Sequence, residues 1–140
     1  MNSKGQRLEA AVKEAGRMDL SPDRVVELYA EIAVMSYYLS TTVADAYRTY
    51  ANAEGDRKAH MARSVIRLQA DGASNAKAVA TVEGSPEHLE LRAKEIGAEV
   101  EYIRWKHIAQ GVANVLSSLQ MRSAYLRDER KATAQAQHIR

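Results

Sequence analysis

The stretch SPDRVVELYAEIAVMSYYL, residues 21–39, decides the fold of this chain. Its apolar residues recur at intervals of three and four: Val25, Leu28, Ile32, Met35 and Leu39. Thr42 and Ala46 continue the same spacing. At the period of an α-helix, this spacing gathers the apolar side chains into one seam by which helices pack together. The stretch therefore predicts a long amphipathic helix.

Two copies of one helix-start signal, Ser-Pro followed by an acid, begin at Ser21 and Ser85. The serine can cap the helix, proline suits its first position, and the carboxylate suits the positive end of the helix dipole. We expect a first long helix over residues 22–70, ended by Asp71-Gly72, and a second over residues 86–131. Whether Gly55 breaks the first helix stays open.

The remaining segments are expected to be small additions to this helix pair. Residues 1–20 predict a short N-terminal helix or a flexible arm, residues 74–82 a short helical piece, and residues 136–140 a flexible tail. No segment alternates with the period of a β-strand. The fold class is therefore all-α, a long antiparallel helix pair, with residues 21–135 as the main helical domain.

Composition limits the possible functions of the 140 residues. The chain has no cysteine, which excludes disulfides, a thiolate nucleophile and cysteine-based zinc sites and favours a cytoplasmic location. The longest uncharged stretch, residues 108–121, is too short to cross a membrane. The 20 Lys+Arg against 18 Asp+Glu make the chain only slightly basic, so net charge alone does not indicate nucleic acid.

No residue pattern supports catalysis or a bound cofactor. The four histidines include no pair at helical spacing for a metal, and His107 on an apolar stripe is expected to be a packed or interface histidine. Phosphate-binding loops, dinucleotide-binding glycine motifs and nucleophile elbows do not occur. We expect a protein without catalytic residues, metal or cofactor, whose role is binding.

The second long helix carries two apolar stripes, one of them Ile96, Val100, Ile103 and His107. A helix with more than one apolar face has more apolar surface than one partner helix can cover. This favours a homo-oligomer over a buried helix in a monomeric bundle. The other stripe supplies the residues predicted to form the oligomer interface: Trp105, Ile108, Val112, Val115, Leu116, Leu119 and Leu126.

A cluster of basic residues without acids lies in residues 57–70, and two tyrosines precede it. Cations that follow phosphates, with aromatic rings that stack on bases, are typical of single-strand binders. The predicted DNA-binding residues are Arg57, Lys58, Arg63, Arg67, Tyr47 and Tyr50. The alternative is an ordinary solvated helix face, although repetition in an oligomer would strengthen even a modest patch.

Three features resemble the UvsY-type recombination mediators of bacteriophages. They are the tyrosine- and alanine-rich residues 28–39, the segment ARSVIRLQADG over residues 62–72, and the long final helix. That helix has aromatic residues at Tyr102 and Trp105 and passes through LSSLQMR, residues 116–122, to a basic, glutamine-rich tail. The resemblance covers residues 28–131.

This resemblance implies an accessory protein of homologous recombination that binds single-stranded DNA and contacts a recombinase and the single-strand-binding protein. It also implies a closed ring of about six or seven subunits, built by the final helix. Arg67 matches the arginine of the DNA-contacting stretch, whereas the lysine two residues earlier is Val65 here. A phage protein of this kind acts in the cytoplasm of the infected cell.

Two other interpretations remain open. The first is a helical oligomeric adaptor or virion assembly or scaffolding protein that binds no specific DNA. The second is an antiparallel coiled coil that stays monomeric until it sequesters a partner helix.

Overall fold

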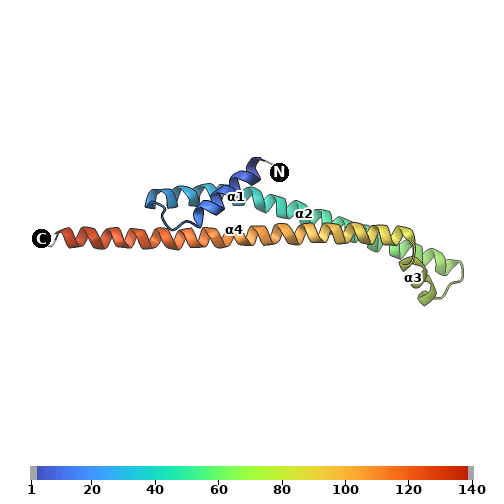
Figure 1. Ribbon diagram of the computed structural model, residues 1–140. Coiled ribbons are helices and arrows are strands. Elements are labelled where there is room, and N and C mark those ends of the chain that lie inside the picture. The colour runs from blue at the N-terminus through green and yellow to red at the C-terminus, as the bar shows by residue number, and fades with distance from the viewer. Residues whose placement is uncertain (1–2, 139–140) are drawn as a thin grey trace. The chain divides into compact units, whose positions relative to one another are not determined.

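A computed structural model describes residues 3–138 of the chain, in four helices and no strand (Figure 1). Helix α1 covers Ser3–Ala15, α2 covers Pro22–Ala70, α3 covers Asn75–Glu83 and α4 covers Pro86–His138. The all-α prediction is confirmed.

Both long helices begin at the signals identified in the sequence. The hydroxyl of Ser21 accepts a hydrogen bond from the backbone N–H of Arg24 at 3.2 Å, and that of Ser85 accepts one from His88 at 3.3 Å. Each bond satisfies an amide that has no partner within its helix. These two caps fix where α2 and α4 start.

Helix α2 runs without a break through Gly55 and ends where the sequence predicts. Gly72 follows it with φ of 95°, a backbone conformation that residues with a side chain rarely adopt. Helix α4 continues to His138, beyond the expected end at residue 131 and into the expected tail, whose residues 139–140 lie outside the described part.

The chain divides into two compact units, each of which is described by itself. Unit 1 comprises Met1–Thr41 and His107–Arg140, described from residue 3 to 138, and unit 2 comprises Thr42–Lys106. Helices α2 and α4 contribute residues to both units.

Unit 1 has an aliphatic core. Helix α1 contributes Ala11 to its buried side chains, and the others come from the predicted seam of α2 and from α4: Val25, Leu28, Ile32, Leu39, Val112 and Leu119. Helix α1 is attached to α2 by Arg24, which forms two hydrogen bonds of 2.7 Å with the carboxylate of Glu14. On α4, Arg122 donates to the backbone carbonyls of Arg17 and Met18, which holds the loop between α1 and α2.

Unit 2 joins α2 to α4 through three layers of polar or aromatic side chains, which we call rungs. The first pairs the rings of His60 and His88, and the second pairs the charges of Arg57 and Glu95. In the third, Tyr102 on α4 contacts two rings of α2, a stacked one from Tyr50 and a tilted one from Tyr47. Residues later in α2 contact residues earlier in α4, so the two helices are antiparallel in unit 2. Helix α3, which follows α2 and precedes α4 in the chain, buries Ala78 and Val82.

None of the helices in residues 3–138 contains a stretch long and apolar enough to cross a membrane.

Candidate nucleic-acid interface

Two of the predicted DNA-binding residues, Arg63 and Arg67, line one groove in unit 2. The groove has a volume of about 410 Å³, and its walls are His60, Arg63, Ser64 and Arg67 of α2 with Glu87 of α4. The arginines lie about one helical turn apart and are both exposed. In the part of the chain that the structure describes, neither guanidinium forms an ion pair. Both are therefore available to an anion.

Arg57 is committed to the interior of unit 2, which corrects its assignment to the DNA-binding surface. Its guanidinium pairs with the buried carboxylate of Glu95, partly through a 3.2 Å bond from Nη2 to Oε1. Arg92 reaches the same carboxylate at 2.9 Å. The hydrogen bond from Arg57 lowers the pKa of Glu95, against the effect of burial, and Arg92 adds to the lowering. Removing Arg57 from this pair would leave a buried charge with one partner fewer.

Lys58 does not share a surface with Arg67. The two residues lie about two and a half turns apart on α2 and so point about 180° away from each other. Lys58 forms an ion pair of 2.7 Å with Glu54, one turn earlier, and its side chain is exposed. The basic residues that are close in sequence are therefore split between opposite flanks of the helix.

The predicted tyrosines lie on the side of α2 away from Arg67. Tyr50 stacks on Tyr102 with parallel planes and ring centroids 6.2 Å apart, and burial raises the pKa of Tyr50. Tyr47 contacts the same ring at 5.3 Å but keeps about half of its surface exposed, 54%. Lys106 Nζ lies 6.0 Å from the centre of Tyr102. Of these two tyrosines Tyr47 is the more exposed, and it lies about 160° around α2 from Arg67.

The predicted oligomer interface is partly used inside unit 1. Val112 is 5% exposed and Leu119 is 2% exposed, so the chain's own residues already cover them. This corrects their assignment to a surface between copies, because a covered side chain cannot also bury itself against a second subunit. The other predicted interface residues are half-buried: Trp105, Ile108, Val115, Leu116 and Leu126.

One feature of unit 2 was missed by the search for functional residues in the sequence. The facing rings of His60 and His88 lie 6.4 Å apart, and His60 Nε2 and His88 Nδ1 are buried without a hydrogen-bond partner among the described residues. Their positions in the sequence, far from i,i+4 spacing, gave no signal. The apolar stripe predicted from Ile96, Val100 and Ile103 is exposed on α4, and Leu89 extends it toward the start of the helix.

Among residues 3–138, no group of three or more histidine and carboxylate side chains is placed to hold a metal ion. Comparison of the chain with protein-family models, with curated proteins and with solved structures found no match.

Proposed function

We propose that this chain is a single-stranded-DNA-binding accessory protein of recombination that works as a homo-oligomer. It would hold a strand by its phosphates, loosen the single-strand-binding protein bound there, and help a recombinase take its place. The observation that carries the proposal is the groove containing Arg63 and Arg67. Two neighbouring guanidinium groups, neither in an ion pair within the described residues, form a site for consecutive phosphates, which Arg binds through paired N–H donors.

The resemblance to the UvsY-type mediators supports the same function from a different direction, since the arginine matched to that family's DNA-contacting stretch is Arg67. Arg57 and Lys58 have carboxylate partners within the chain, so phosphate contact falls to Arg63 and Arg67. Tyr47 would contribute only where a strand reaches the opposite flank of α2. A closed ring, as that family implies, would repeat the groove once per subunit and add avidity.

The groove also contains one group that opposes an anion. Glu87 forms part of its wall, and its negative charge would repel a phosphate. We therefore expect Glu87→Gln to strengthen binding while Arg63→Glu with Arg67→Glu abolishes most of it. Changes in opposite directions from one groove are a sharper test than a loss alone.

The experiment measures the binding of labelled single- and double-stranded oligonucleotides at several salt concentrations. The slope of log affinity against log salt should fall by about one for each phosphate that the protein no longer binds, so the double variant should lower it by about two. Arg48→Glu with Lys94→Glu is the matched control, because both bases are exposed, lie in unit 2 outside the groove and pair with nearby acids. Binding without single-strand preference, or undisturbed by the double variant, contradicts the proposal and favours a helical adaptor or scaffolding protein.

A further inference from the structure

An exposed apolar stripe runs along α4 in unit 2, on a side of the helix that does not face α2. Its residues, which we call the outer seam, follow alternating steps of four and three: Leu89, Ala93, Ile96, Val100 and Ile103. Leu89 is 57% exposed and Val100 is 58% exposed, with Ile96 and Ile103 only slightly lower. This is the repeat by which helices associate as coiled coils.

The contacts of α4 with α2 show that the outer seam is not part of the packing within the chain. His88, Glu95 and Tyr102, which contact α2, recur every seven residues. On a helix they form a line about 120° away from the centre of the outer seam. One face of α4 therefore packs against α2, while another face presents a regular row of aliphatic side chains to which a second helix could bind.

The charges beside the outer seam indicate which helix fits. Arg92, Glu99 and Lys106 flank it on one side, and Glu90, Gly97 and Arg104 on the other. In a parallel, in-register pair, each residue of the first set meets the residue five positions ahead in the partner. Glu99 then meets Arg104 of the second copy, twice by symmetry, and Arg92 meets the uncharged Gly97.

An antiparallel pair of the same seams is less favourable. The alignment that places Ile96 opposite Val100 pairs Glu90 with Arg104, but it brings Glu99 against Glu99 of the second copy. It also brings Arg92 against Lys106. Like charges beside a helix interface select against that orientation. The charge pattern is thus self-complementary in one direction only.

We propose that the outer seam binds the outer seam of a second copy of this chain as a parallel, in-register coiled coil. The surface differs from the interface predicted from residues 105–126, and as a two-fold contact it joins subunits in pairs, so a ring would need a second contact as well. It does not require DNA binding. Self-association and oligonucleotide binding are separate measurements, so either proposal can fail without the other.

The first test is sedimentation equilibrium of the full chain over a range of concentrations. Ile96→Glu with Val100→Glu should lower the average mass and weaken self-association at least about tenfold, because it buries charge in the contact. Ile66→Glu is the matched control: Ile66 is a similarly exposed isoleucine of unit 2, 65%, but lies on α2. It should leave the mass unchanged. Circular dichroism confirms that each variant keeps its helices.

The second test determines the orientation. Glu99→Arg alone should weaken association, since it sets an arginine against Arg104 of the second copy, and Glu99→Arg with Arg104→Glu should restore it. In the antiparallel arrangement the double change would place the two introduced arginines against each other and the introduced glutamate against Glu90, so association would not recover. A wild-type chain that stays a single subunit, seam variants of unchanged mass, or a double swap without rescue would each overturn the proposal.

Discussion

The two units use the same pair of long helices but bury different kinds of side chain. Unit 1 places Leu28, Ile32 and Leu119 inside, each at most 2% exposed, whereas unit 2 joins its helices through histidine, ion-pair and tyrosine rungs. Apolar burial supplies most of the free energy of folding, while paired polar groups roughly offset the cost of their own desolvation. Unit 1 can thus be stabilised by its own core.

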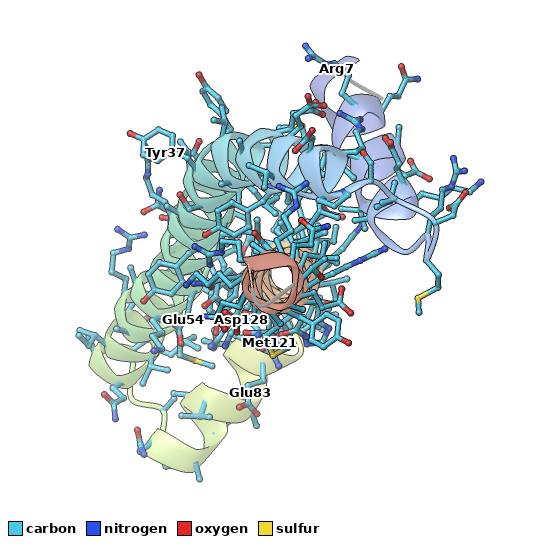
Figure 2. The ribbon with its side chains drawn as sticks, turned by 90° about the vertical axis from the view of Figure 1, so that its left-hand side faces the viewer. Arg7, Tyr37, Glu54, Glu83, Met121 and Asp128 are labelled. Atoms are coloured by element: carbon cyan, nitrogen blue, oxygen red, sulfur yellow. The ribbon has the colours of Figure 1, made fainter. Side chains whose placement is uncertain are left out.

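Unit 2 keeps much of its aliphatic surface outside, on the outer seam and at Ile66. A polar interior specifies how two helices align, because buried charges and polar groups need complementary partners, but it adds little net stability. The association proposed for the outer seam would add apolar burial to unit 2, whose own interior supplies less of it than the core of unit 1. Unit 1 also has exposed side chains: Tyr37 projects outward from α2 in Figure 2, and Val26, Val34 and Met121 are each more than half exposed.

The largest expected loss of stability comes from a large-to-small substitution in the core of unit 1. Leu28→Ala removes a fully buried side chain and should lower the free energy of unfolding by about 4 kcal/mol, through reduced apolar burial and the cavity left behind. Urea unfolding followed by circular dichroism, at one fixed protein concentration, measures it. Val34→Ala is the control, since Val34 lies on the same helix but is 61% exposed and should change stability by less than about 0.5 kcal/mol. Equal effects of the two variants would remove the distinction between an aliphatic core and an exposed face.

A smaller loss of stability is expected when the ion pair between Arg57 and Glu95 in unit 2 is broken. Arg57→Ala leaves the buried carboxylate of Glu95 with Arg92 alone and should cost about 2 to 3 kcal/mol, at or below the usual range for breaking a buried pair. Arg57→Met combined with Glu95→Leu should recover most of that loss, because no buried charge then remains. The same urea titration gives the double-mutant cycle. A double variant as unstable as Arg57→Ala would mean that the ion pair itself contributes net stability, contrary to the contrast between the units.

Much of the fold follows from local sequence patterns. The three- and four-residue spacing identified Val25, Leu28, Ile32, Met35 and Leu39 as a packing seam, and all of them except the half-buried Met35 are buried. The two Ser-Pro signals located the starts of α2 and α4, because a capping hydroxyl acts within one turn. What the pattern could not decide was which stripe of α4 is covered, since both have the same spacing and the choice depends on the register between distant residues.

The candidate site was predicted less well, for the same reason. Lys58 and Arg67 look like one cluster when counted along the chain, whereas their angular separation on a helix sets them on opposite flanks. That separation is already present in the sequence. The ion pair of Arg57 cannot be read from the sequence in this way, because its partner Glu95 lies 38 residues away and contacts it only once α2 and α4 are paired.

The smallest expected effect is a difference in how much one carboxylate of each unit contributes to the loss of stability at low pH. Arg57 holds the pKa of buried Glu95 below the ordinary 4.5, chiefly by hydrogen bonding, and Arg24 does the same for the surface residue Glu14 in unit 1. A carboxyl whose pKa is lower in the folded state stabilises that state fully above pH 4.5, and this contribution is lost as pH falls through the folded value. Solvent screens the Glu14 pair, so Glu95 should account for more of the loss. Thermal unfolding between pH 6 and about pH 3 should therefore depend less steeply on pH in Glu95→Gln than in the control Glu14→Gln. A Glu95→Gln variant with the wild-type pH profile would show that the rung contributes no more to acid stability than a solvent-exposed pair.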